Sequence, residues 1–313
     1  MTAPRTSDLN APPLERGVVR KAGGGIYEVR LATGDVVDAR LRGHLKLQQR
    51  TGSAVVVGDR VQVKLHADGS WTVEQVEPRA SELARRSPGG GHRARVIVAN
   101  VDQVVVVLAA ARPEPHLRML DRFLVLCEAN YLPAVIVVNK LDLVPAAELA
   151  NRFAPYLAAG YPLLFTSVLQ GVGIEEVRAL LRGRTSVLTG PSGVGKSSLL
   201  NALEPGLALR TGEVSEAVEK GQHTTVSAEL VPLAAGGYVA DTPGLRELGL
   251  WAVPLDELDA FFPEFEPFLA ACRFTRSCTH THEPECAVRD AVAAGRIAPA
   301  RYESYCALLH GEA

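Results

Sequence analysis

The segment GPSGVGKSS at residues 190–198 constrains the fold more than any other part of the chain. It follows the short apolar run TSVLTG and precedes KSSLLNALE, whose apolar residues recur at helical spacing. Two glycines followed by Lys-Ser, between a strand and a helix, are typical of a loop whose backbone N–H groups surround phosphates. The alternative, a glycine-rich turn that carries Lys-Ser by chance, is disfavoured by the flanking strand and helix. The segment therefore predicts an α/β domain.

The residue types of this loop suggest separate roles. Gly190 and Gly195 permit the turn, Lys196 reaches the β and γ oxygens as a catalytic cation, and the Ser197 hydroxyl ligates Mg²⁺. The other candidate nucleotide-binding residues of the loop are Ser192, Gly193, Val194 and Ser198.

Buried strands and helices alternate around the loop, as in a parallel sheet covered on both faces. We expect strands at 101–110, 133–143, 162–168 and 185–190, and helices at 119–130, 146–160, 174–184 and 196–204. Two further strands, at 227–233 and 237–244, are joined by a glycine-containing turn and predict an antiparallel hairpin at the sheet edge.

The tetrapeptide NKLD at 139–142 ends one of the buried strands, at the edge where open α/β sheets bind ligands. Asp142 can accept both N1–H and the exocyclic amine of guanine, a donor pair that adenine lacks. Asn139 would support the loop, and the Lys140 stem would cover the ring. Ser167, at the end of the next strand, could place its backbone N–H near guanine O6, although a structural role is equally open.

The hairpin ends in DTPG at 241–244, where Asp241 can hold Mg²⁺ through water and the Gly244 N–H can meet a γ-phosphate. Alone, this tetrapeptide is also compatible with an ordinary turn that begins at aspartate.

The rest of the chain divides into smaller parts. We expect a flexible tail at 1–13, a small all-β barrel at 14–78, a basic linker without regular structure at 79–95, the α/β domain at 96–250 and a helical module at 251–313.

The first 95 residues hold 16 Lys and Arg against 10 Asp and Glu, although the whole chain has a net charge of −2. This asymmetry favours a phosphate-rich partner for the barrel, with an ordinary solvated surface as the alternative. Aromatic residues make up only 5% of the chain, which disfavours a base-stacking platform.

Nothing in the sequence predicts export or membrane insertion. The N-terminal residues have no apolar core of the kind found in signal peptides, and the longest apolar run, at 104–111, is much shorter than a membrane helix of about 20 residues. We expect a cytoplasmic protein.

Four residues of the C-terminal module could hold a metal: Cys272, Cys278, His280 and Cys286. Three thiolates and one imidazole suffice for a structural zinc site, with His282 as a competing ligand. The alternative is that the cysteines are small buried hydrophobes.

The order of these motifs is unusual, because the base-reading tetrapeptide precedes the phosphate loop. NKLD, FTSV, GPSGVGKSS, GQHTT and DTPGLRELGLW, with a β module before them and a Cys/His segment after them, resemble the circularly permuted RsgA family of small-ribosomal-subunit biogenesis GTPases. The resemblance implies an N-terminal OB-fold, a zinc-bearing C-terminal domain, binding of GTP or GDP, and action on the small ribosomal subunit and its rRNA late in maturation. It further implies that Thr225 in GQHTT meets Mg²⁺ and the γ-phosphate, with Thr224 as the alternative. We expect the free protein to be monomeric.

Catalysis poses a separate question, because Leu245 stands where Ras-type GTPases carry a glutamine that orients the attacking water. His223, beside the switch threonines, is the candidate substitute; a group supplied by a partner, or a purely structural His223, are the alternatives. Two other functions remain open: a kinase-like metabolic enzyme with a phosphate-binding loop, which NKLD disfavours, and a GTP-binding module that does not hydrolyse.

Overall fold

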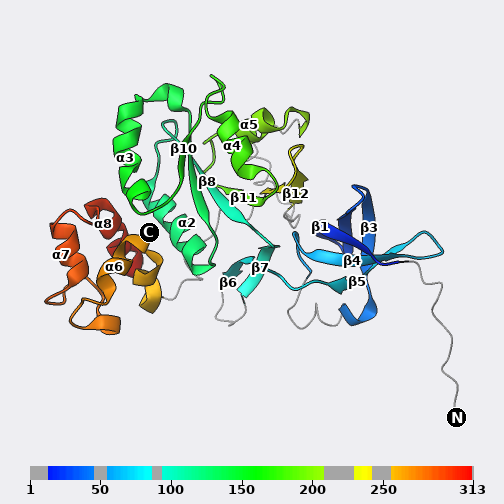
Figure 1. Ribbon diagram of the computed structural model, residues 1–313, viewed down its shortest axis with the longest axis horizontal. Coiled ribbons are helices and arrows are strands. Elements are labelled where there is room, and N and C mark those ends of the chain that lie inside the picture. Colours follow the sequence, from blue (N-terminus) through cyan, green and yellow to red (C-terminus); the bar gives the residue numbers. More distant parts are fainter. Residues whose placement is uncertain (1–12, 46–54, 87–93, 208–228, 242–254, 312–313) are drawn as a thin grey trace, which may run out of the picture.

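A computed structural model describes residues 13–45, 55–86, 94–207, 229–241 and 255–311 (Figure 1). In this view the barrel, the α/β domain and the C-terminal helices follow one another along the long axis of the molecule. Within the described ranges, no helix is both long enough and apolar enough to cross a membrane.

The N-terminal module is a five-stranded barrel, as predicted. Its strands are β1 (Glu15–Gly23), β2 (Ile26–Leu31), β3 (Val36–Leu41), β4 (Arg60–Leu65) and β5 (Trp71–Val76). They run in the order β1-β2-β3-β5-β4, and pairing of β1 with β4 closes the barrel. Alternate valines, such as Val61 and Val63 on β4, fill the interior with no exposed surface. The module is therefore an OB-fold.

The structure differs from the expected connector at 79–95. Strand β6 (Glu82–Arg86) pairs antiparallel with β7 (Ala94–Ala99), and residues 87–93 lie outside the described part of the chain. Leu83 and Val98 are buried in the core of the α/β domain, and Arg79 forms an ion pair with the fully buried Asp59 at 2.7 Å. The prediction of a segment without regular structure was wrong. Because the segment is rich in arginine and glycine, its sequence pattern did not show that Leu83 and Val98 are buried apolar contacts.

The α/β domain has the predicted alternation of strands and helices. Its strands are β8 (Gln103–Ala109), β9 (Ala134–Asn139), β10 (Leu163–Phe165), β11 (Thr185–Thr189), β12 (Glu229–Pro232) and β13 (Tyr238–Asp241), in the sheet order β10-β9-β8-β11-β13-β12. All pairs are parallel except β12 with β13. The predicted hairpin is therefore confirmed.

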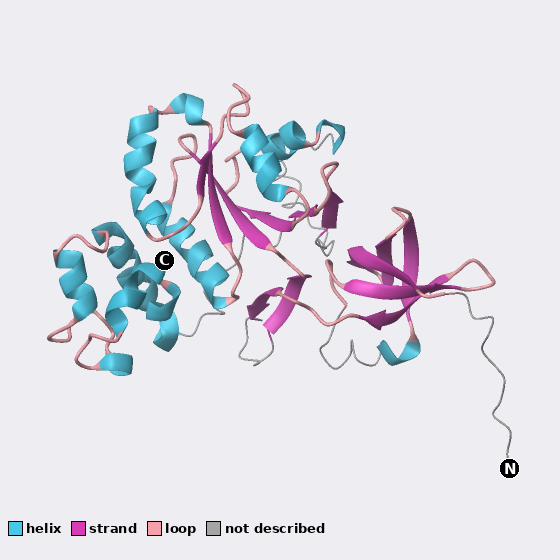
Figure 2. Ribbon diagram, in the orientation of Figure 1, coloured by secondary structure: helices cyan, strands magenta, loops and turns pink. Residues whose placement is uncertain are grey.

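Helices cover both faces of this sheet (Figure 2). Helices α2 (Leu117–Ala129) and α3 (Ala146–Ala158) share one core with Val104, Val106 and Leu108 of β8. Helices α4 (Ile174–Leu181) and α5 (Lys196–Leu203) share a second core with Val105 and Val107. Because successive residues of a strand point to opposite faces, the unbroken valine run of β8 serves both layers.

The hairpin does not leave a free sheet edge. Lys21 of β1 pairs with Glu229 of β12 along the backbone, and their side chains form an ion pair at 2.8 Å. The guanidinium of Arg20 also donates to Leu230 O at 3.1 Å. The barrel and the α/β domain are thereby joined into one continuous sheet at β12.

The C-terminal module is made of short helices, as expected. They are η5 (Leu255–Phe261), η6 (Pro263–Phe265), α6 (Glu266–Leu269), η7 (Thr275–Ser277), α7 (Ala287–Ala293) and α8 (Pro299–Leu309). Their core includes Val125 and Leu126 of α2, so that α2 has apolar contacts with both the sheet and this module. At this interface Arg301 of α8 forms an ion pair with Asp121 of α2 at 2.5 Å.

Candidate nucleotide and metal sites

The glycine-rich loop connects β11 to α5, as the sequence predicts. Gly195 caps the helix in a left-handed conformation, and Lys196 and Ser197 begin the first turn of α5. The Lys196 ammonium donates to Gly190 O at 2.7 Å and to Pro191 O at 2.6 Å. The loop therefore curls around this ammonium at a helix N-terminus, a position that favours anions.

Two glycines of the loop have no room for a side chain. A Cβ at Gly190 would lie 2.0 Å from Val107 O of β8, and a Cβ at Gly195 would lie 2.4 Å from the amide nitrogen of Asn139. Both residues also have positive φ, of 136° and 95°. Close packing against β8 and against NKLD thus explains why glycine is needed at these two positions.

Asn139 links the NKLD tetrapeptide to the glycine-rich loop. Its side chain is 2% exposed, its Nδ2 donates to Val194 O at 3.0 Å, and its Oδ1 accepts from the Thr166 hydroxyl at 3.1 Å. One buried amide therefore holds the end of β9 to the segments that follow β10 and β11, although 55 residues separate Asn139 from Val194. The predicted supporting role of Asn139 thus has a definite geometry.

Ser167 has a different geometry from the one we expected. Its backbone N–H donates to Val172 O at 3.0 Å and is not available to a base, whereas its hydroxyl donates to a carboxylate oxygen of Asp142. The small β-bridge between Ser167 and Val172 thus removes the expected donor, and the Ser167 side chain orients Asp142 instead. In this part of the structure, the backbone N–H of the next residue, Val168, has no backbone acceptor.

A loop that the sequence analysis missed lies between the two motifs. It follows β8, which is flanked by β9 and β11, so that its residues lie at the same sheet edge as NKLD and the phosphate loop. The Lys140 ammonium donates to Arg112 O, and Pro113 lies 3.6 Å from the position of a Cβ on Gly193. Its sequence, ARPEP, carries no motif, and only the position of β8 in the sheet could have revealed it.

The remaining predicted nucleotide residues are only partly described. The backbone of Asp241 ends β13, beside Leu188 of β11, which brings it to the same sheet edge. Thr225, His223 and Gly244 lie outside the described residues.

The predicted metal ligands come together in the C-terminal module. The ligand atoms of Cys272, Cys278, His280 and Cys286 all lie within 4.8 Å of one another, and all four residues are buried. His280 Nδ1 is 3.5 Å from Cys272 Sγ and 3.4 Å from Cys286 Sγ, and the two sulfur atoms are 3.9 Å apart. Ligands about 2.3 Å from a central zinc would be about 3.8 Å apart in a tetrahedron. The cluster therefore fits a zinc ion.

The competing ligand, His282, is exposed and lies outside this cluster. Its N–H and that of Thr281 donate to the Glu283 carboxylate, which also accepts from the Thr279 N–H and hydroxyl. Burial alone would raise the pKa of Glu283, but these hydrogen bonds lower it to about 2. The Glu283 carboxylate thereby organises the backbone between two of the ligands, and the geometry favours His280 over His282.

The fold and the nucleotide site define the class of protein. A phosphate loop that is hydrogen-bonded to NKLD at the carboxyl edge of a parallel sheet is the nucleotide site of a GTPase. Because NKLD precedes the loop in this chain, the α/β domain is a circularly permuted GTPase domain. An OB-fold precedes it in the chain, and a Cys/His module follows it.

Comparison with known proteins identifies the family. Residues 16–72 match the RsgA N-terminal domain, and residues 76–251 match the RsgA GTPase domain. The chain is 54% identical to the small ribosomal subunit biogenesis GTPase RsgA of Gemmatimonas aurantiaca, over 93% of this chain and 95% of that one, and 46% identical to the protein of the same name from Moorella thermoacetica, over 94% and 96%. The chain belongs to the RsgA GTPase family.

Solved structures agree with this assignment. The crystal structure of YjeQ from Thermotoga maritima has 38% sequence identity and a TM-score of 0.79, and the match covers 96% of this chain and 98% of that one. YloQ, described as a circularly permuted GTPase, has 29% identity and a TM-score of 0.74, with 99% and 97% covered. The similarity therefore extends over all three parts of the chain.

Proposed function

We propose that this protein hydrolyses GTP and acts on the small ribosomal subunit during its biogenesis. The observation that carries the proposal is the Asn139 amide that joins NKLD to the phosphate loop, in a chain whose relatives bear the name of this function. A guanine-reading carboxylate has no use in an ATP-dependent kinase, and the family is one of GTPases rather than of inert GTP-binding modules.

In the proposed site, Asp142 reads guanine and Ser167 orients its carboxylate, as their hydrogen bond supports. Asn139 holds the two motifs together and Lys140 covers the base. The phosphates bind the loop through Gly190, Ser192, Gly193, Val194, Gly195, Lys196, Ser197 and Ser198.

Mg²⁺ would be held by the hydroxyls of Ser197 and Thr225, with Asp241 acting through water and the Gly244 N–H on the γ-phosphate. Because Leu245 cannot orient water, we propose that His223 does so once the small subunit is bound.

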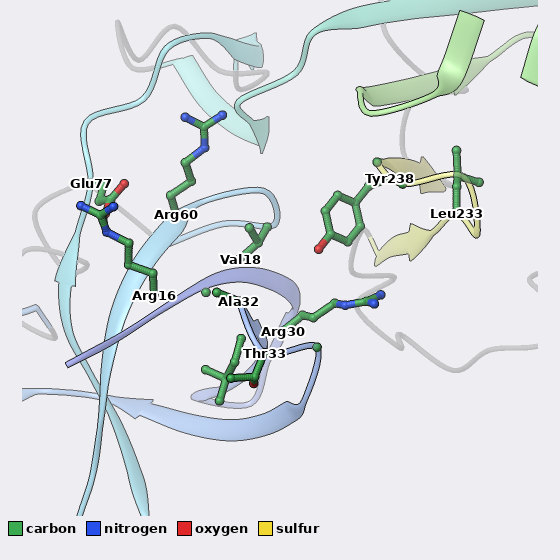
Figure 3. Close-up of a pocket in the computed structure, with 14 residues that line it drawn as sticks. Arg16, Val18, Arg30, Ala32, Thr33, Arg60, Glu77, Leu233 and Tyr238 are labelled. Carbon is green, nitrogen blue, oxygen red and sulfur yellow. The ribbon is translucent and has the colours of Figure 1, made fainter. Parts of the chain in front are cut away.

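The contact with rRNA is proposed to involve the seam between the barrel and the β12–β13 hairpin. A cleft of about 710 Å³ lies there, lined by Arg16, Arg30 and Arg60 from the barrel and by Tyr238 from the hairpin. Figure 3 shows Arg30 and Tyr238 extending into the space between the two modules. Arg16 pairs with Glu77 at 3.3 Å, whereas Arg30 and Arg60 have no ion-pair partner in the described structure. Guanidinium groups in an open cleft suit the phosphates of an RNA strand.

Co-sedimentation with small ribosomal subunits tests the proposed function. The protein should pellet with the subunits in the presence of a non-hydrolysable GTP analogue and remain largely in the supernatant with GDP. Equal partition in both nucleotide states would refute a GTP-dependent role on the subunit.

A pair of matched charge reversals tests the cleft. Arg30→Glu should weaken subunit binding, and the slope of log affinity against log salt should decrease by about 1 for each phosphate that Arg30 neutralises in the wild type. Arg40 is an exposed barrel residue outside the cleft, and Arg40→Glu is therefore the control variant. Equal weakening by both variants would place the RNA contact elsewhere on the barrel.

Domain limits near residues 13, 78 and 250 remain part of the proposal, as do a monomeric free state and a cytoplasmic location. Limited proteolysis and sedimentation of the free protein test the first two.

A further inference from the structure

The His280 ring is held from two sides. Its Nδ1 faces the sulfur atoms of Cys272 and Cys286, and its Nε2 lies 3.2 Å from a carboxylate oxygen of Asp259. A neutral imidazole carries one proton, and a carboxylate accepts a hydrogen bond but does not donate one. The carboxylate therefore favours the tautomer with its proton on Nε2, which leaves the lone pair of Nδ1 directed at the cysteines.

Other contacts fix the backbone around His280 but not its ring nitrogens. The Tyr302 hydroxyl donates to His280 O at 2.6 Å and the Tyr305 hydroxyl donates to Thr279 O at 2.9 Å. The rings of Phe265 and Tyr305 lie near the imidazole, with centroids 6.4 Å and 6.2 Å away, and provide no acceptor at Nε2. Asp259 is thus the polar partner of the outer ring nitrogen.

Asp259 comes from outside the Cys/His segment. It lies on η5, 21 residues before His280, and its neighbour Leu258 is fully buried in the core that includes Val125 and Leu126 of α2. The carboxylate is consequently supported by an element that packs on the α/β domain.

We propose that Asp259 is a positioning residue of the metal site, which orients His280 for coordination through Nδ1 and makes it a stronger ligand. This inference rests on the zinc assignment. A carboxylate behind a metal-bound histidine sets the orientation and basicity of the ring, and its removal typically lowers metal affinity by about 10-fold to 100-fold. Through Asp259, retention of the metal depends on the docking of η5 as well as on the four ligands.

Zinc binding by the full-length protein tests the proposal. Zinc content after purification and zinc affinity in competition with a chromogenic chelator should be measured for the wild type, Asp259→Ala, Asp259→Asn and Asp256→Asn. Asp256 is an exposed carboxylate on the same helix and has no contact with His280, which makes it the matched control. Zinc affinity should fall by about 10-fold to 100-fold in Asp259→Ala, fall less in Asp259→Asn, which keeps an acceptor oxygen, and stay unchanged in Asp256→Asn.

A spectroscopic measurement separates ring orientation from general loss of stability. In ¹⁵N-histidine spectra of the zinc-loaded wild type, the His280 Nε2–H should give a resonance protected from solvent exchange, and Asp259→Asn should weaken this protection while GDP affinity stays unchanged. The zinc assignment itself would be refuted if the purified wild-type protein contained no zinc and the Cys278→Ser variant did not differ from it in stability. Wild-type protein that holds zinc while Asp259→Ala binds it equally well would overturn only the role of Asp259.

Discussion

Replacement of Arg301 by methionine should weaken the docking of α8 on the α/β domain. Arg301 is 1% exposed and donates to Asp121 at 2.5 Å and to Glu264 at 2.6 Å and 3.1 Å. Its guanidinium also lies over the Phe262 ring, 4.7 Å from the centroid. Methionine fills much of the same volume but leaves the buried Asp121 carboxylate and the partly buried Glu264 carboxylate without a cation.

Breaking a buried ion pair in this way costs about 3–5 kcal/mol. Hydrogen exchange of the α8 amides measures the effect locally, because exchange from a docked helix requires its opening. Since about 1.4 kcal/mol corresponds to a factor of ten, exchange in α8 should be faster by about two to three and a half powers of ten. Arg152→Met is the matched control, because Arg152 forms only surface ion pairs, with Glu148 at 2.8 Å and Glu114 at 3.2 Å, which contribute about 0–1 kcal/mol.

A compensated variant shows whether the missing charge is the cause. Arg301→Met combined with Asp121→Asn and Glu264→Gln removes the buried carboxylates, and α8 exchange should return most of the way to the wild-type rate. If the triple variant exchanged as fast as Arg301→Met, poorer packing rather than uncompensated charge would be the cause, and the electrostatic explanation would be refuted.

Three further predictions concern the nucleotide site and pH. Asp142→Asn should weaken GTP binding by about 10-fold to 150-fold, because it removes hydrogen bonds to a charged group. In competition assays the variant should prefer xanthosine nucleotides. Unchanged GTP affinity would contradict the role of Asp142 in base recognition. In single-turnover assays, His223→Ala should bind GTP normally yet lose about 10²-fold to 10⁴-fold of the subunit-stimulated rate; equal stimulated rates would place the catalytic group on the ribosome. Burial raises the pKa of Glu128, although the Tyr161 hydroxyl donates to it at 3.0 Å. A carboxyl group whose pKa is higher in the folded state destabilises the fold as pH rises and the group ionises. Glu128→Gln should therefore be more stable than the wild type at neutral pH, and this difference should vanish near pH 4. A melting-temperature difference that did not depend on pH would contradict this.

The sequence alone determines those features that depend on residues near one another in the chain. Continuous valine runs predict β8 and β9, and the glycine and lysine pattern predicts the loop between β11 and α5. Three Cys and two His residues within one short segment predict the metal cluster, and the structure favours His280 over His282 as the fourth ligand. In each case the local chemistry leaves few alternatives, because a strand buried on both faces, a phosphate-binding turn and a metal site each require particular residue types at short spacing.

Only the tertiary structure decides which distant groups meet. The Asn139 amide reaches Val194, Arg301 reaches Asp121 across 180 residues, and Lys21 pairs with Glu229 where the barrel joins the sheet. The same packing takes the Ser167 N–H away from the base and places Asp259 behind His280. Polar side chains of these types are common on any surface, and their partners are set by the order of the strands and the docking of helices. The sequence pattern therefore does not reveal them.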